Sequence, residues 1–135
     1  MKTAVRYFSR GGNTEKLAEA IAEAVGVKAE DVSVPITEKV DLLFLGNSVY
    51  AGNPDDAVKA FLQQNAGMIG AVASFGSSAS LRSNRKKLAA MGGELSFRLC
   101  EEEFICPGSF LFLHKGRPNA DDCAAAQAFA RKLVE

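Results

Sequence analysis

The stretch Thr3-Ala4-Val5-Arg6-Tyr7-Phe8-Ser9-Arg10-Gly11-Gly12-Asn13-Thr14 decides the fold of this chain. The apolar run over residues 3–8 predicts a buried strand, and helical spacing from Glu15 to about Val25 predicts an amphipathic helix. Residues 9–14 connect this strand to this helix. They comprise two glycines, the hydroxyl residues Ser9 and Thr14, and Arg10 and Asn13. Backbone N–H groups and the positive end of the helix dipole point into such a loop, so it suits a phosphate. A plain strand-to-helix connection is the alternative that this motif alone leaves open.

The rest of the chain alternates strand-like and helical segments. Strands are predicted at 31–34, 41–46, 69–75 and 94–100, with an apolar run at 108–114 that can extend the same edge. Helices are predicted from Pro54 to about Gln64, from Ser83 to Met91 with a stop at Gly92-Gly93, and after a cap at Asn119, carrying Ala125, Phe129, Ala130 and Leu133. The alternation predicts an α/β fold, a three-layer doubly wound sandwich with a parallel sheet and helices on both faces.

Bulk composition fits a single domain, 1–135, with a substantial hydrophobic core. Sixteen Lys and Arg balance sixteen Asp and Glu, which argues against a nucleic-acid or anionic-membrane surface. No run approaches the roughly 20 apolar residues of a spanning helix, and the start lacks a signal-peptide pattern. Three scattered cysteines and one histidine are too few for a zinc site. They predict free thiols in a reducing cytosol, hence a cytoplasmic protein without a metal.

Three loops that follow strands are candidates for binding: 9–14, 47–53 and 75–80. In a doubly wound sheet ligands bind beyond the carboxyl ends of strands, where the strand order reverses. Tyr50 in the second loop can stack on a flat ring or, equally well, pack over its own loop. Backbone groups of the third loop, which is rich in Ser and Gly, can bond the edge of a ring, although a solvated turn is the commoner outcome.

These residues carry a resemblance to a known family. The chain resembles short-chain flavodoxins and flavodoxin-like domains over nearly its whole length. Residues 9–14 resemble the family's phosphate loop, and 41–46 followed by 48–52 resemble its third strand and first flavin-flanking loop. Residues 73–77 resemble the fourth strand with the second flavin loop. The ending 112–119, leading into 129–133, is similar to that of flavodoxin-like proteins of this size.

The resemblance implies a five-stranded parallel sheet of order 2-1-3-4-5 and FMN as the cofactor. It places the FMN phosphate on Ser9, Arg10, Gly11, Gly12, Asn13 and Thr14. It places the ring beside Ser48, Tyr50, Gly52 and Asn53 on one side and Gly76, Ser77 and Ser78 on the other. The flavin itself supplies redox chemistry, so no catalytic side chain and no metal is expected.

Four departures from the family pattern stand out. Gly11 replaces a usual hydroxyl residue, which the Arg10 guanidinium can offset. Residues 76–80 lack the acidic residues and the stacking Tyr of typical flavodoxins. Typical flavodoxins are also strongly acidic, whereas this chain is neutral. The connection from Pro35 to Val40 is too short for a full crossover helix.

The leading hypothesis is an FMN-binding electron-transfer protein that works with a redox partner protein or a small-molecule electron acceptor. One alternative is an FMN-dependent NAD(P)H:quinone-type oxidoreductase, for which the missing second aromatic would leave an open pocket over the ring. Another is a flavin-free binding module on the same fold. A magnesium-dependent phosphoacceptor domain fits poorly because the strands end without carboxylates. A P-loop nucleoside triphosphatase is excluded because no Lys-Ser/Thr pair follows the glycines.

Features outside the three loops are expected to be structural. The basic cluster Arg82, Arg85, Lys86 and Lys87 is predicted to be a solvated helix face, and Glu101-Glu102-Glu103 an exposed loop. We expect Cys106 to be a buried small hydrophobe and His114 to have a surface or capping role.

Overall fold

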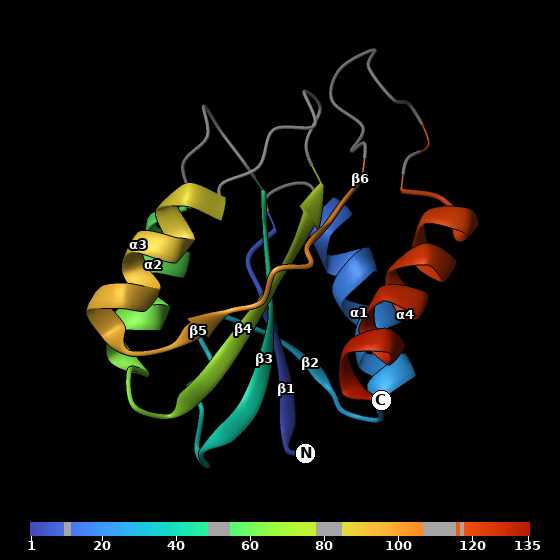
Figure 1. The fold of residues 1–135 in the computed structure, drawn as a ribbon. Coiled ribbons are helices and arrows are strands. Elements are labelled where there is room, and N and C mark those ends of the chain that lie inside the picture. Colours follow the sequence, from blue (N-terminus) through green and yellow to red (C-terminus); the bar gives the residue numbers. More distant parts are fainter. Residues whose placement is uncertain (10–11, 49–54, 78–84, 107–115, 117) are drawn as a thin grey trace.

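The computed structural model describes residues 1–9, 12–48, 55–77, 85–106, 116 and 118–135. Ten elements follow one another in these ranges (Figure 1): β1 (Thr3–Tyr7), α1 (Asn13–Val25), β2 (Ala29–Asp31), β3 (Val40–Ser48), α2 (Asp56–Gln64), β4 (Ile69–Ser77), α3 (Arg85–Leu95), β5 (Arg98–Leu99), β6 (Phe104–Cys106) and α4 (Ala120–Val134).

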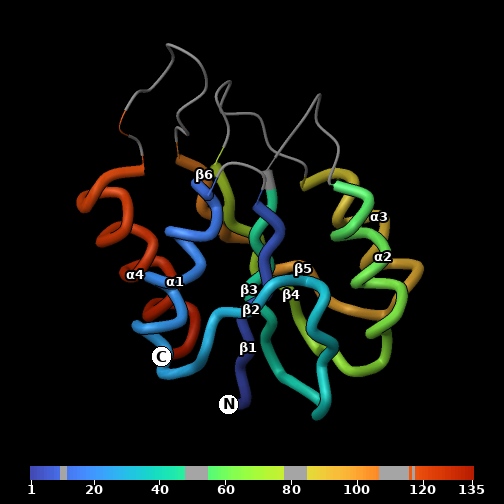
Figure 2. The backbone as a smooth tube through the Cα atoms, turned by 180° about the vertical axis from the view of Figure 1, so that it is seen from behind, coloured from blue at the N-terminus to red at the C-terminus, as the bar shows by residue number. Residues whose placement is uncertain are grey.

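The strands form one sheet in which every described pair is parallel. Its order is β2-β1-β3-β4-β5, with β6 also paired to β4 beyond the end of β5. Helices α1 and α4 cover one face, and α2 and α3 cover the other, as Figures 1 and 2 show from opposite sides. The predicted α/β three-layer doubly wound sandwich of order 2-1-3-4-5 is confirmed, with a sixth short strand added.

Alternating side chains of the two central strands fill two separate cores. Phe44 on β3 and Phe75 on β4 pack beneath α1 and α4, while Leu45 on β3 and Val72 on β4 pack beneath α2 and α3. These four side chains are fully buried. Because both faces of the sheet are covered, the sequences of β3 and β4 are continuous apolar runs rather than alternating ones.

Helix α3 corrects the prediction that Gly92-Gly93 ends it, because it continues through both to Leu95. Gly92 is buried, and a Cβ there would lie 2.8 Å from the carbonyl oxygen of Phe97. Its role is therefore close packing of the chain that returns under the helix. The left-handed position that follows the helix is taken by Ser96, with φ 64°.

Other boundaries also differ from those predicted. Strand β2 lies at 29–31 instead of 31–34, and only residues 98–99 of the predicted fifth strand pair with β4. Strand β6 was not predicted. The three glutamates directly before it indicate an exposed loop rather than the approach to a strand. Residues 32–39, all of them described, contain no helix between β2 and β3, as the short connection indicates. The run 108–114 and the predicted start at Pro54 lie outside the described residues.

Helix α4 begins as its sequence indicates. The Asn119 side chain accepts a hydrogen bond from Asp122 N, and the Asp122 carboxylate accepts one from Asn119 N. This reciprocal pair satisfies two N–H groups at the helix start. On the apolar face Ala130 is buried and Phe129 and Leu133 are partly buried, but Ala125 is exposed and Ala126 takes the buried position instead.

Candidate functional site

The carboxyl ends of β1, β3 and β4 lie together at one end of the sheet (Figure 1). Tyr7 pairs with Gly46, Gly46 with Phe75, and Ser48 with Ser77. Parallel strands with helices on both faces place the loops that follow them at one edge. All three loops singled out from the sequence therefore leave the sheet at this edge.

The loop after β1 leads into a helix start without a capping side chain. Gly12 is the N-cap of α1, its φ is 86°, and as a glycine it has no side chain to accept from the N–H groups of the first turn. The Gly12 amide donates to Ser9 Oγ at 3.0 Å, which closes a compact turn just before the helix. Helix α4, in contrast, has its start satisfied by its own side chains. The beginning of α1 thus combines a glycine turn with the positive end of a helix dipole.

Thr14 joins this helix start to the end of β4. Its side chain is fully buried, and its Oγ1 lies 3.3 Å from the Oγ of Ser77 in a hydrogen bond that either hydroxyl can donate. Ser77 is also buried, with 5% of its surface exposed. Two residues 63 positions apart in the sequence, each predicted for a different loop of the site, are in direct contact.

Two glycines let the strand ends and the helix start approach closely. A Cβ at Gly46 would lie 2.6 Å from the Phe75 ring and 2.9 Å from the Thr14 methyl group. A Cβ at Gly76 would overlap the backbone carbonyl oxygen of Asn47. Neither position accepts a larger residue without a shift of its surroundings. The sequence identifies Gly46 only as the end of a strand; its place directly after a buried apolar run is the signal of a packing role.

The remaining predicted site residues divide into two groups. Asn13 is half-buried in the first turn of α1, and the backbone of Ser48 ends β3. Outside the described residues lie Arg10, Gly11, Tyr50, Gly52, Asn53 and Ser78.

Asn47 lies at the same sheet edge as the candidate site residues, although sequence reasoning did not select it. Only 1% of its surface is exposed, and it lies near the end of β3, where its carbonyl oxygen faces Gly76 on β4. The signal that could have found it is a polar residue directly after the apolar run of a central strand. Such a residue is buried by its neighbours in the sheet, so its amide must find partners inside the protein.

Tyr7 at the end of β1 lies in an acidic setting. Burial raises the pKa of its phenol, and the negative charges of Glu15, Asp31 and Glu19 raise it further. The phenol therefore keeps its proton at neutral pH. It remains a neutral hydrogen-bonding group beside the helix that begins the site.

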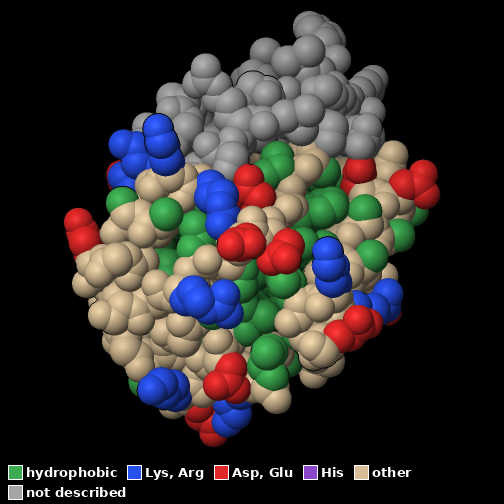
Figure 3. All heavy atoms as spheres, viewed as in Figure 1, with side chains coloured by type: hydrophobic (Ala, Val, Ile, Leu, Met, Phe, Trp, Pro, Cys, Tyr) green, Lys and Arg blue, Asp and Glu red, His purple; other side chains and the backbone are tan. Residues whose placement is uncertain are grey.

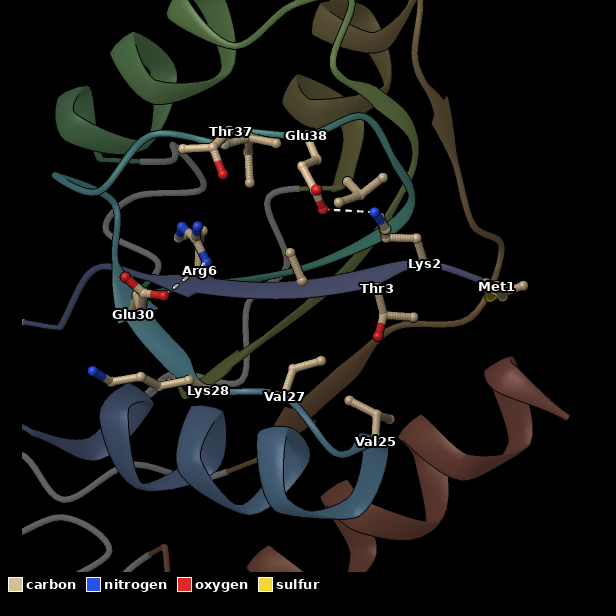
Figure 4. A pocket seen from close by; sticks show the side chains of 13 residues that line it. Met1, Lys2, Thr3, Arg6, Val25, Val27, Lys28, Glu30, Thr37 and Glu38 are labelled. Atoms are coloured by element: carbon tan, nitrogen blue, oxygen red, sulfur yellow. Dashed lines mark hydrogen bonds and ion pairs between the residues drawn. The ribbon is translucent and has the colours of Figure 1, made fainter.

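A hollow of about 450 Å³ lies over the amino-terminal half of β1, among α1, β2 and residues 36–40 (Figure 4). Arg6 points toward it, and its guanidinium donates to the carbonyl oxygens of Val34, Val5 and Pro35 at 2.9, 3.0 and 3.2 Å. Burial lowers the pKa of Arg6, and the Glu30 carboxylate 4.0 Å away opposes this shift. These bonds hold in place the segment that replaces a crossover helix between β2 and β3.

At the rim of this hollow Lys2 forms an exposed ion pair with Glu38, with Nζ and Oε2 2.6 Å apart. The hydrogen bond from Lys2 and its positive charge lower the pKa of Glu38. Arg6, Lys2 and these two glutamates are thus already engaged with one another or with the backbone. We assign the hollow to the support of the β2–β3 connection.

The surface carries charges of both signs. On the face shown in Figure 3 basic side chains (blue) and acidic side chains (red) are interspersed among apolar ones (green). Lys86 and Lys87 are exposed on α3, as expected for a solvated face, while Arg85 is half-buried. Glu101 and Glu102 are exposed, and Glu103 is half-buried.

Of the remaining residues predicted to be structural, the structure describes Cys106 but not Arg82 or His114. Cys106 is buried at the end of β6, as predicted, with 3% of its surface exposed. Arg82 and His114 lie outside the described residues.

The described part of the chain contains neither a membrane-spanning helix nor a cluster of metal ligands. No helix there is long and apolar enough to cross a membrane. Within the same ranges, no three His, Cys, Asp or Glu side chains gather in a group that could hold a metal ion.

Comparison with known proteins agrees with this arrangement. The family model described as a flavodoxin domain matches residues 4–98. The chain belongs to the flavodoxin domain family. This flavodoxin domain is also 30% identical to an uncharacterized protein of Methanocaldococcus jannaschii, over all of this chain and 99% of that protein.

Solved structures of the same fold include flavodoxins. A flavodoxin from the domain Archaea matches with a TM-score of 0.75 and 17% identity, covering 99% of this chain and 96% of that one. Oxidised flavodoxin 1 of Bacillus cereus matches with a TM-score of 0.74 and 20% identity, covering 99% and 97% of the two chains. At these identities the likeness is one of fold alone.

Proposed function

We propose that this protein binds FMN at the carboxyl ends of β1, β3 and β4 and serves as an electron-transfer flavoprotein. The observation that carries the proposal is the start of α1. Its N-cap is a left-handed glycine without a capping side chain, and its first turn packs against the ends of both β3 and β4. Membership of the flavodoxin domain family supports FMN as the ligand.

The described residues fit the phosphate end of FMN. Gly12 brings the backbone of the turn close to a ligand, since no described residue beyond its chain neighbours lies within 4 Å of its missing Cβ. Ser9 Oγ accepts the Gly12 amide, which leaves its hydroxyl hydrogen to donate to an anion. We assign the phosphate to Ser9, Arg10, Gly11, Gly12, Asn13 and Thr14, among which Arg10 and Gly11 lie outside the described residues. Asn13 and Thr14 would offer it backbone N–H groups of the first turn of α1, because the Thr14 hydroxyl is bonded to Ser77.

The ring would lie between the loops that follow β3 and β4. We assign one side of it to Ser48, Tyr50, Gly52 and Asn53, and the other to Gly76, Ser77 and Ser78. The last three would bond the edge of the ring through backbone groups, because the Ser77 hydroxyl is bonded to Thr14. The close contact between Gly76 and Asn47 supports this assignment because it fixes the distance between the starts of the two loops. FMN, once bound, would supply reversible uptake of electrons, so the chain itself needs only to bind and orient it.

The partner of such a carrier is a redox protein or a small-molecule electron acceptor. A second function uses the same site to oxidise NAD(P)H and reduce a quinone-type acceptor. Residues 76–80 contain no aromatic side chain, which favours an open ring face. A flavin-free binding module is the third possibility on this fold.

Binding of FMN is tested by reconstitution and fluorescence titration, with two glycine variants that flank α1. Gly12 and Gly26 both have positive φ, of 86° and 77°, and beyond their chain neighbours no described residue has an atom within 4 Å of either missing Cβ. Ala at either position strains the backbone by about 1 kcal/mol. We expect Gly12→Ala to weaken FMN binding about tenfold, as the loss of a shaped anion site, and Gly26→Ala to leave it unchanged.

Wild-type protein that stays colourless and ignores added FMN would refute the proposal. If Gly12→Ala and Gly26→Ala change FMN affinity equally, the assignment of the phosphate to the loop before α1 is refuted. Among flavin binders, steady-state oxidation of NAD(P)H with a quinone identifies the oxidoreductase, and its absence identifies the carrier.

A further inference from the structure

Thr14 occupies a junction of three elements. It is the second residue of α1, its hydroxyl bonds Ser77 at the end of β4, and its methyl group faces the space above Gly46 on β3. The side chain has no exposed surface. A hydrogen bond in such a setting is not weakened by competing water, so it constrains both of its ends.

The two hydroxyls of this pair belong to different halves of the site. Thr14 ends the loop assigned to the phosphate, and Ser77 lies in the loop assigned to the ring edge. A backbone hydrogen bond from Phe8 N to Gly46 O, of 3.0 Å, ties the strand before the first loop to β3 as well. The distance between the two halves is thus set inside the protein, at the Thr14–Ser77 contact.

We propose that Thr14 and Ser77 are positioning residues that fix the spacing between the phosphate subsite and the ring subsite. This rests on the proposed binding of FMN. A ligand that holds both groups in one molecule depends on the spacing, whereas separate ligands for each subsite do not. The pair therefore selects for the complete cofactor over its parts.

The variants isolate the hydroxyl pair from its packing. Thr14→Val removes the hydroxyl and keeps the shape, and Ser77→Ala removes its hydrogen-bond partner. The double variant removes both hydroxyls, so neither is left without its partner. Thr14→Ser retains the hydroxyl. The matched control is Ser74→Ala, also on β4, which removes a buried hydroxyl for which the described residues provide no hydrogen-bond partner.

Three probes are titrated against each variant: FMN, riboflavin and inorganic phosphate. We expect either single variant to lower FMN affinity about three- to tenfold, the effect of one hydrogen bond, and the double variant to lose no more than one single variant does. Riboflavin and phosphate affinities stay within about twofold of wild type in all of them. Thr14→Ser and Ser74→Ala bind FMN as wild type does.

A different pattern overturns the proposal. If Thr14 only binds phosphate and Ser77 only binds the ring, Thr14→Val weakens phosphate, Ser77→Ala weakens riboflavin, and the losses add for FMN. Failure of Thr14→Ser to restore FMN binding would equally exclude the hydroxyl pair. Should Thr14→Val fail to fold, the double variant still decides, because it carries no orphaned hydroxyl and is compared directly with Ser74→Ala.

Amide hydrogen exchange on the flavin-free protein separates this proposal from that of FMN binding. Thr14→Val and Ser77→Ala should each speed exchange both in the first turn of α1 and at the end of β4, while Ser74→Ala does neither. Faster exchange only at the mutated element would show that the pair couples nothing. Wild-type protein that shows this coupling but binds no FMN would refute the proposed function and, with it, the role of the coupling in FMN selection.

Discussion

At Gly76 the backbones of β3 and β4 lie so close that a single carbon atom would not fit. The position faces the carbonyl oxygen of Asn47, which is itself fixed in the sheet. A flexible side chain could move aside, but a ladder carbonyl cannot without breaking the pairing of the two strands. The constraint therefore acts at the point where both proposed ring loops begin.

We expect Gly76→Ala to lower the free energy of unfolding by about 3 kcal/mol or more, because the added methyl group must displace backbone. The measurement is urea denaturation followed by circular dichroism. Ser74→Ala is the control on the same face of β4, and it should be neutral or slightly stabilising since its buried hydroxyl has no partner among the described residues. A Gly76→Ala protein as stable as wild type would show that the strand ends can separate at low cost.

At this scale the sequence predicts where the site lies better than how it is built. Glycines and hydroxyls directly after apolar strands locate the loops, because parallel strands bring their carboxyl ends to one edge. The contact between Thr14 and Ser77 cannot be predicted in this way. It depends on the register of β1, β3 and β4, and a shift of one residue in β4 would turn the Ser77 hydroxyl to the other face of the sheet.

Elements end where packing, rather than local propensity, requires. Gly92-Gly93 indicates a helix stop, yet α3 continues through both because Phe97 packs directly beneath Gly92. Strand β6 follows three glutamates and escapes prediction, because its pairing with β4 at Phe75 to Ser77 is a tertiary contact. The central strands β3 and β4 are predicted well, since burial on both faces leaves a continuous apolar run in the sequence itself.

The two glycines of α3 lead to opposite predictions although they are neighbours. A Cβ at Gly92 would lie 2.8 Å from the carbonyl oxygen of Phe97, while a Cβ at Gly93 would meet nothing within 4 Å in the described part of the chain outside its own helix turn. Gly92→Ala should destabilise the protein by about 1–3 kcal/mol through overpacking. Gly93→Ala should stabilise it by about 0.5–1 kcal/mol, the gain in helix propensity. Thermal and urea unfolding of the pair give the comparison, and two effects of the same sign would contradict the packing role of Gly92.

The two ends of the sheet have different structural roles. The carboxyl ends of β1, β3 and β4 present the three loops, while the hollow over the amino-terminal half of β1 supports a connection that lacks a crossover helix. Arg6 replaces part of what that helix would contribute, by donating to three backbone carbonyls. The sequence indicates the missing helix through the short connection, but not the residue that compensates for it.

This division predicts that stability and flavin binding can be changed separately. Arg6→Met leaves the carbonyls of Val34 and Pro35 without their donor, so we expect a loss of about 2–4 kcal/mol in unfolding free energy. FMN affinity should remain within about twofold of wild type, since Arg6 alternates with Val5 on β1 and so shares the face of Ala4, whereas α1, which carries Thr14, packs on the Val5 face. Urea unfolding and FMN titration of the variant and the wild type test both halves of the prediction.

The control for this prediction is Lys2→Met, at the rim of the same hollow. The ion pair of Lys2 with Glu38 is exposed and should contribute no more than about 0.5 kcal/mol, because water screens the two charges and competes for their hydrogen bonds. Both variants replace a cation by the same apolar side chain on β1 or next to it, so a difference between them reports the buried backbone contacts of Arg6 rather than the change in net charge. An Arg6→Met protein of normal stability whose FMN affinity has fallen severalfold would show that the two ends of the sheet are not independent.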